Sequence, residues 1–157
     1  MHLNEKGFTL IELMVTIGLL SLMLVLTLPV LNGAADSLKL KAEADRMAAV
    51  MRMARQEAIV SGQVRTVVFF TDGRYQVFDH VNNKYINYRL DANVKMAGNS
   101  FKTRYADRPA CFFQPLGNPL LGGTVALQGS SGKAIYVITA PVQGRIRVSF
   151  QPPDNWD

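Results

Sequence analysis

The chain has few of the residues on which metal sites, disulfide-stapled folds and many enzymes depend. Among its 157 residues are one cysteine and two histidines. Cys111 has no partner for an internal disulfide, so packed side chains must hold the fold together. Phe112 and Phe113 follow it directly, which predicts a buried thiol. His2 and His80 lie far apart in the sequence, and no Cys or His cluster has the spacing of metal ligands.

Catalytic motifs are also missing. A Ser-His-acid site would depend on His80, which the sequence places at a hairpin end with no nucleophile motif beside it. The glycines at 122–123 and 129–132 do not have the form of a phosphate-binding loop and are better interpreted as hairpin turns. We therefore expect no enzymatic activity, no cofactor and no metal.

Charge is absent from one long stretch near the N-terminus. The 19 residues from Leu13 to Leu31 are uncharged and mostly apolar. As a helix rising ~1.5 Å per residue they would extend about 28 Å, close to the ~30 Å hydrocarbon core of a bilayer. One carboxylate, Glu12, lies just before the run. A charge placed in lipid is costly, so an acidic residue there suggests a specific partner.

Residues 7–12 read GFTLIE, and this stretch resembles the N-terminus of type IV pilins and pseudopilins. The resemblance implies that a prepilin peptidase cuts between Gly7 and Phe8 and methylates the new amine of Phe8. It implies that Glu12 pairs with the N-terminal amine of a neighbouring subunit during assembly. Pro29 matches the proline that the family carries near the end of the apolar helix.

An ordinary secretory signal peptide is the alternative interpretation of this segment. Such a peptide has a short apolar region followed by a small-residue cleavage site. Asn32-Gly33-Ala34-Ala35 offers small residues, but the apolar run is long and Glu12 would have no explanation. The pilin interpretation is therefore favoured.

The apolar run predicts the first half of one long helix that continues to about Val60. Past Asp36 the pattern becomes amphipathic, and Ser61-Gly62 supplies a helix end. Small and apolar residues recur there at spacings of three and four, on one face: Leu40, Ala44, Met47, Met51, Ala54 and Ala58.

After Gly62 the hydrophobic period changes to two, which is typical of strands. Asp72-Gly73 and Asn82-Asn83 predict the turns of a three-stranded meander. We expect residues 97–110 to be irregular. The later strands are expected as one set: 110–114, 124–128, 134–139 and 145–150. The predicted class is α+β, with a long N-terminal helix packed on antiparallel sheets.

Three looser patterns narrow the resemblance to the GspH/FimT group of minor pilins and pseudopilins. The helix ends in R-x-x-A-x-x-S-G from Arg55 to Gly62, an F-x-P-x-G element begins at Phe113, and Gly144-Arg145 opens the last strand. The resemblance implies a low-copy subunit that starts or caps a type IV pilus or a type II secretion pseudopilus. Its implied partners are other pilins of the filament, the prepilin peptidase and the inner-membrane assembly platform.

The resemblance also implies a division of the chain and a location. Residues 1–7 would be a leader, 8–36 the membrane-spanning and assembly half of the helix, and 37–157 a periplasmic globular domain. The protein is expected in the bacterial inner membrane as a single-pass subunit, and in the filament.

One segment carries possible binding chemistry. Arg145 and Arg147 are two residues apart, so in a strand both side chains project from one face. G-R-x-R resembles the motif of DNA-binding FimT-type pilins that serve natural transformation, and arginine forks match phosphate geometry. Lys133, across a hairpin, would extend the patch, as would Lys102, Arg104 and Arg108 in the segment expected to be irregular. The alternatives are a solvated strand face or salt bridges to a neighbouring subunit's Glu43, Asp45 or Glu57.

Overall fold

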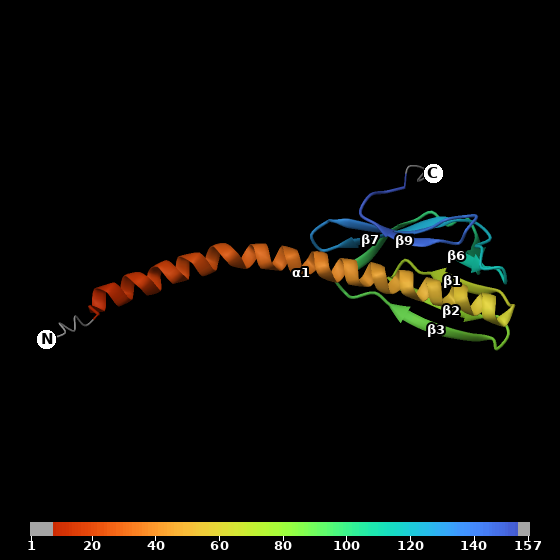
Figure 1. Cartoon of the computed structure of the whole chain (residues 1–157), viewed down its shortest axis with the longest axis horizontal. Helices are drawn as coiled ribbons and strands as arrows, with labels where there is room; N and C mark the ends of the chain where they lie inside the picture. The colour runs from red at the N-terminus through yellow and green to blue at the C-terminus, as the bar shows by residue number, and fades with distance from the viewer. Residues whose placement is uncertain (1–7, 154–157) are drawn as a thin grey trace, which may run out of the picture. The chain divides into compact units, whose positions relative to one another are not determined.

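The computed structural model of the chain describes residues 8–153, with the backbone alone for residues 26–32. The described part contains one long helix, α1 (Leu10–Ser61, 52 residues), followed by nine strands (Figure 1). The strands pair antiparallel in two sheets. The predicted α+β class is confirmed.

The chain divides between Ala35 and Asp36 into two compact units. In the first unit, Thr9 precedes the helix, and its Oγ1 accepts a hydrogen bond from the backbone N–H of Glu12 at 3.3 Å. Thr-x-x-Glu is the capping-box spacing, in which polar side chains satisfy backbone donors that have no partner within the helix. Thr9 therefore caps the beginning of α1, and Glu12 stands at the third helical position that a capping box uses.

The segment from Phe8 to Val25, which is helical from Leu10 on, buries none of its large apolar side chains. Their exposed fractions run from 53% at Leu13 to 81% at Phe8. Exposed apolar residues lie all around the segment rather than along one stripe, because consecutive positions such as Leu19 and Leu20 are both exposed. The segment therefore has no packed core of its own within this unit.

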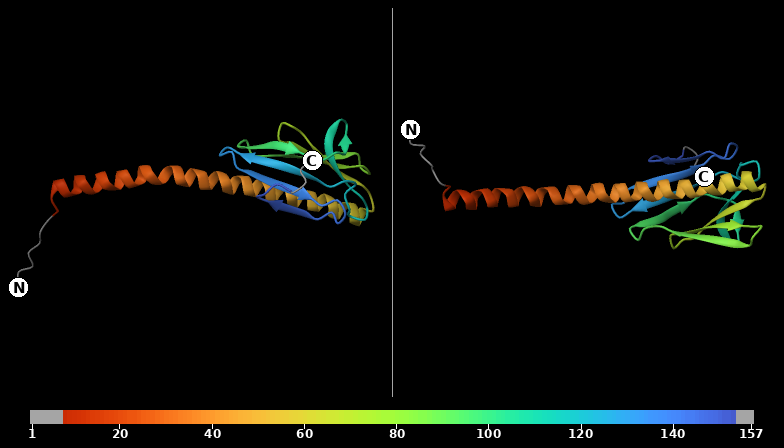
Figure 2. Two further views of the ribbon diagram at one scale, coloured as in Figure 1. Left: turned by 90° about the horizontal axis from the view of Figure 1, so that it is seen from above. Right: turned by 60° about the horizontal axis from the view of Figure 1, so that its bottom comes forward.

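The part of α1 in the second unit is amphipathic, as predicted. All six residues of the expected face, from Leu40 to Ala58, are at most 1% exposed. They share one core with the inward-facing residues of both sheets, including Phe69, Tyr75 and Leu127. The alanines let the sheets approach the helix closely, and Figure 2 shows strands on two sides of it.

The first sheet has five strands in the order β3-β2-β1-β6-β5. Their bounds are β1 (Arg65–Phe69), β2 (Arg74–Asp79), β3 (Lys84–Arg89), β5 (Arg104–Tyr105) and β6 (Arg108–Phe113). The predicted meander is confirmed, because β1 pairs with β2 and β2 with β3. Gly73 and Asn83 adopt positive φ in its two turns, at 80° and 51°.

The second sheet has four strands in the order β4-β7-β8-β9. Their bounds are β4 (Val94–Asn99), β7 (Gly123–Gly129), β8 (Ala134–Thr139) and β9 (Ile146–Ser149). Along β7 and β8 alternate residues enter the core, so Val125 and Val137, which face each other, are fully buried. The outer face of this sheet carries Arg147 opposite Ile138.

Two expectations for the middle of the chain are wrong. Residues 97–110 are not irregular, because the end of β4, the whole of β5 and the start of β6 lie there. β4 shifts register between Met96 and Gly98, so the glycine that signals a loop sits at a bulge within a paired strand. The segment 110–114 does not join the later strands either. It pairs with β1, where Cys111 faces Val67.

Cys111 is fully buried and free, as the sequence predicts. Burial raises the pKa of its thiol far above the ordinary value. The thiol is thus a packing residue of the core rather than a reactive group.

Candidate functional site

The N-terminal processing site lies at the edge of the described region. Gly7 is outside the described residues, and Phe8, the first described residue, is 81% exposed. Glu12 is exposed and makes no ion pair within residues 8–153. Among the described residues, no helix is found that is both long enough and apolar enough to span a membrane. The side chain of Pro29 also lies outside the description.

The three looser motifs of the globular unit meet at one point beside α1. Arg55 Nε donates to the Gly117 carbonyl oxygen at 2.7 Å, and its Nη2 donates to the Gln143 carbonyl oxygen at 3.3 Å. Gly144 has a φ of 61°, and a Cβ there would lie 2.3 Å from the Gly117 oxygen. Only glycine fits this junction, so the motifs mark a structural joint between helix and sheet.

This joint positions the beginning of β9. One helical turn before Arg55, Arg52 Nη2 donates to the Ile146 carbonyl oxygen at 3.1 Å. Ile146 is buried, and the residues on either side of it, Arg145 and Arg147, are exposed. Two arginines of the helix therefore anchor the backbone from which two other arginines project. Sequence reasoning did not assign Arg52 this role, and its only signal is its helical spacing from Arg55.

Arg145 and Arg147 border a groove of about 720 Å³ on the outer side of the second sheet. Lys102 also lines it, and none of the described residues that line it is acidic. The polar members Ser100, Thr124 and Gln143 add hydrogen-bonding groups to the wall. Such a groove attracts anions, because three cations lie along its border and no described lining residue is a carboxylate that would neutralise them.

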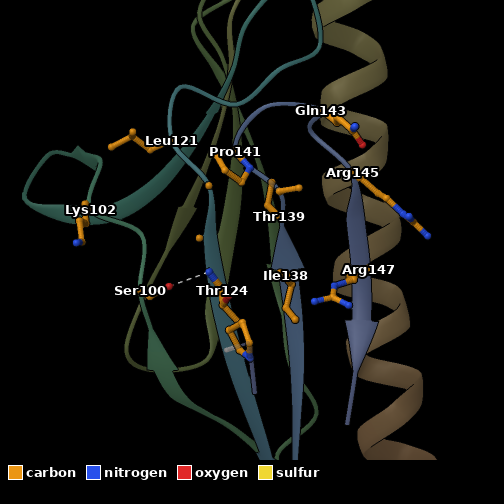
Figure 3. A pocket seen from close by; sticks show the side chains of 14 residues that line it. Ser100, Lys102, Leu121, Thr124, Ile138, Thr139, Pro141, Gln143, Arg145 and Arg147 are labelled. Atoms are coloured by element: carbon orange, nitrogen blue, oxygen red, sulfur yellow. Dashed lines mark hydrogen bonds between the residues drawn. The ribbon is translucent and has the colours of Figure 1, made fainter. Parts of the chain in front are cut away.

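The two arginines of the pair do not lie parallel. Figure 3 shows Arg147 directed over the sheet toward Ile138, whereas Arg145 extends from the sheet edge away from it. Two separate anionic groups suit this arrangement better than a single one. Phosphates repeated along a polymer meet that requirement.

Glycines shape the opposite wall of the groove. A Cβ on Gly122 would lie 2.8 Å from Pro141 Cδ, and one on Gly123 would lie 2.4 Å from Phe101 Cδ1. The expected hairpin turn at 122–123 is wrong, because β7 begins at Gly123 and the turn to β8 comes after Gly129. The pair permits close approach of neighbouring backbone and rings.

Lys133 is not brought together with the arginine pair. It lies in the β7–β8 turn, five residues before Ile138, or about 16 Å along the strand at ~3.3 Å per residue. Its Nζ donates to Ser37 Oγ at 3.2 Å. Lys102, from the segment between β4 and β5, does line the groove, as the sequence suggested.

His80 is engaged in the sheet rather than in a catalytic or metal site. Its Nε2 lies 2.7 Å from Thr66 Oγ1, and its ring packs edge-on against Phe78. Burial lowers the pKa of His80, and the Arg65 charge adds to that effect. No group of three potential metal ligands was found among residues 8–153.

Comparison with known families and structures agrees with this architecture. The family model described as Type II transport protein GspH matches residues 43–151. The chain belongs to the GspH family. A second model, the prokaryotic N-terminal methylation motif, matches residues 2–28 of this GspH-family chain. The predicted resemblance to minor pilins and pseudopilins is thereby confirmed.

Individual relatives support the same assignment. The chain is 28% identical over 146 residues to the competence protein ComGD of Bacillus subtilis (strain 168). The matched region covers 92% of this chain and 94% of ComGD. Its fold is similar to that of the minor pseudopilin EpsH of the Vibrio cholerae type 2 secretion system, with a TM-score of 0.58 at 14% identity, covering 71% of this chain and 96% of EpsH. The type IV minor pilin FimU of Pseudomonas aeruginosa gives a TM-score of 0.52 at 12% identity, covering 75% of this chain and 95% of FimU.

Family membership also decides the broad class of function. GspH-family proteins and the structural neighbours are pilins and pseudopilins, so this chain is not an enzyme and assembles with other pilins in a filament.

Proposed function

We propose that this GspH-family chain is a membrane-anchored minor pilin or pseudopilin that starts or caps a type IV pilus or a type II secretion pseudopilus. The prepilin peptidase would cut between Gly7 and Phe8 and methylate Phe8. Leu13–Leu31 would cross the bacterial inner membrane, leaving the globular unit in the periplasm beside the assembly platform. The supporting observation is the beginning of α1, from Leu10 to Val25, whose large apolar side chains are exposed on all sides.

The physical argument concerns what covers that surface. Exposing more than ten large apolar side chains to water is unfavourable, at about 25 cal/mol for each Å². Lipid covers them before assembly, and neighbouring pilin helices cover them in the filament, so transfer between the two never exposes them to water. Because each subunit contacts the next through two different surfaces, the assembly does not close on itself and the filament can extend.

Glu12 then acts as the contact that sets the register of a new subunit. Its carboxylate, unpaired within residues 8–153, would neutralise the N-terminal amine of a neighbour in a medium of low dielectric constant. Because Glu12 also occupies the capping-box position, a variant must remove its charge and keep its hydrogen-bonding capacity.

Glu12→Gln meets that requirement. In a host that assembles the filament, we expect this variant to enter the membrane normally but to fall at least about tenfold in sheared filaments. Thr9→Ala is the matched control, since it removes the cap and keeps the carboxylate, and it should be recovered almost as the parent is. Equal recovery of Glu12→Gln and the parent would show that the charge is not an assembly contact.

A second function, contact with DNA during DNA uptake, is favoured by the acid-free groove at Arg145 and Arg147. The likeness to a competence protein supports it as well. Binding would be weak and insensitive to sequence, because arginines on an open groove contact phosphates rather than base edges.

Duplex DNA titrated with the full chain in detergent micelles tests this second function. A plot of log affinity against log salt concentration should be less steep for the Arg145→Ala and Arg147→Ala double variant than for the parent. The slope should change by about 0.9 for each arginine that contacts a phosphate. Lys133→Ala, which removes one positive charge from the β7–β8 turn, should leave the slope nearly unchanged. An unaltered slope in the double variant would restrict the groove to contacts between subunits.

A further inference from the structure

The outer face of the five-stranded sheet carries an aromatic surface that the core does not use. Inward residues of β1 and β2, such as Phe69 and Tyr75, pack against α1, and their neighbours project to the other side. There Phe78 stacks on Tyr85 at 4.4 Å and contacts Tyr105 at 5.3 Å. Phe112 adds an edge contact to Tyr105 at 6.4 Å.

A basic row runs parallel to these rings on the same face. Phe70 follows β1, and its ring lies beneath two guanidinium groups, with Arg108 at 4.4 Å and Arg74 at 5.1 Å from the centroid. Arg74 is partly neutralised by Asp72, whose oxygen accepts from its Nε at 2.6 Å. Arg108 makes no ion pair within residues 8–153, so its charge is available to a ligand.

Between the two rows the sheet forms a pocket of about 490 Å³. Its floor is one cross-strand row, in which Val68 faces Gln76 and Gln76 faces Asn87. Tyr85 and Tyr105 line one side, and Phe70, Arg74 and Arg108 line the other. The pocket thus joins aromatic faces, two side-chain amides and arginine charge within a volume suited to a ligand of nucleotide size.

We propose that this aromatic pocket binds single-stranded nucleic acid, with one unpaired base held against Tyr85 and Tyr105. The amides of Gln76 and Asn87 offer both donors and acceptors to the edge of the base. Arg108 contacts the adjoining phosphate, and Arg74 shares its charge between that phosphate and Asp72. Aromatic rings interleaved with basic residues on a sheet surface are the arrangement that stacks successive bases of a single strand.

The chemistry of the pocket disfavours two other ligands, a nucleic-acid duplex and a neutral sugar. A duplex keeps its base faces stacked inside the helix, so it presents no ring to Tyr85. A neutral sugar would use the rings and amides but leave the Arg108 charge without a partner. The pocket lies on the other sheet from the Arg145–Arg147 groove, so it does not depend on the function proposed for that groove.

The test compares single-stranded and duplex oligonucleotides of equal length, bound to the full chain in detergent micelles and followed by fluorescence anisotropy. The parent should bind the single strand more tightly. Tyr85→Ala should weaken single-strand binding by roughly 5- to 150-fold, the range for loss of one base stack. Tyr85→Phe keeps the ring and should bind within about threefold of the parent.

Charge is tested separately. Arg108→Ala should flatten the salt dependence of single-strand affinity by about 0.7 in log-log slope, whereas Lys95→Ala, an exposed lysine on β4, should not change it. The Arg145→Ala and Arg147→Ala double variant should keep the preference for single strands, which separates this site from the groove. A parent without that preference, or a folded Tyr85→Ala variant that binds single strands as tightly as the parent, would overturn the proposal.

Discussion

The two parts of α1 are made of similar apolar residues and differ in what covers them. Met23, in the first unit, is 67% exposed, whereas Met47, in the second unit, is fully buried. In the first part exposed apolar residues occupy every face, whereas in the second a continuous row of apolar residues is buried on the face toward the sheets, with charges such as Lys39 and Arg46 on the others. The distribution of residues around the helix, rather than their hydrophobicity alone, separates the two parts.

The two parts of the helix are therefore stabilised by different contacts. The second part is stabilised by the protein's own sheets, so its residues should contribute to the free energy of unfolding of an isolated subunit. Among the described side chains, the first part has no such contacts within its unit, and under the proposed function lipid or neighbouring pilin helices cover it. Substitutions there should alter assembly and leave the stability of the globular unit unchanged.

Exchanging one methionine in each part gives the largest expected effect. Met47→Ala leaves a cavity between the helix and the sheets and should lower the free energy of unfolding by about 2–5 kcal/mol. Met23→Ala should change it by less than about 0.5 kcal/mol. Chemical denaturation in detergent micelles, followed by circular dichroism, measures both. Equal losses in the two variants would abolish the distinction between the two parts of the helix.

Local patterns in the sequence predicted the fold wherever a single element carried its own signal. The helical spacing from Leu40 to Ala58 named the buried face, and Asp72-Gly73 named a hairpin turn. The pairing of β6 with β1 was not predictable in this way, because it joins segments over 40 residues apart in the sequence. The strand β4 was not predicted, because its pairing with β7 overrides the loop preference of Gly98.

The candidate sites divide along the same line. Alternation predicted that Arg145 and Arg147 are both exposed, which requires no distant contact, but Arg145 lies just before β9 and its side chain extends away from the sheet. The sequence offered several cations near the pair, and only the path of the chain between β4 and β5 selects Lys102 from them, while Lys133 lies in the β7–β8 turn. The aromatic pocket was missed because Tyr85, Tyr105 and Phe70 come from three separate segments.

Removing the hydrogen bonds that Arg55 makes at the helix-to-sheet joint should lower the free energy of unfolding by an intermediate amount. Arg55→Met keeps most of the side-chain volume but leaves the Gly117 and Gln143 carbonyl oxygens without the guanidinium donor. We expect a loss of about 1.5–3 kcal/mol in the free energy of unfolding, the range for hydrogen bonds to a charged group. Lys41→Met is the control on the same part of the helix. Its ion pair with Asp45, at 2.9 Å, is exposed on both sides, so its loss should cost at most about 1 kcal/mol.

The smallest effect concerns the face of the five-stranded sheet turned away from the helix, where His80 bonds to Thr66. Burial and the Arg65 charge lower the pKa of His80, and Asp79 only partly opposes them. The folded state therefore favours the neutral ring, and the unfolded chain, with an ordinary pKa near 6.5, binds a proton more readily. Stability from this source is complete above pH 6.5 and is lost as the pH falls through the folded pKa. Because the residue is exposed, solvent screens the effect and keeps it small.

Thermal unfolding between pH 7.5 and pH 5 isolates this histidine, since the pKa values of Asp72 and Asp79 are lowered from 3.8 and these groups titrate below that window. The parent should lose stability toward pH 5, and His80→Gln, which retains a hydrogen-bonding group for Thr66, should lose less of it over the same range. The comparison with Met47 then becomes sharper, because Met47→Ala should shift the whole curve downward without changing its dependence on pH. A His80→Gln curve parallel to that of the parent would mean that the outer face of the sheet holds His80 without distinguishing its two protonation states.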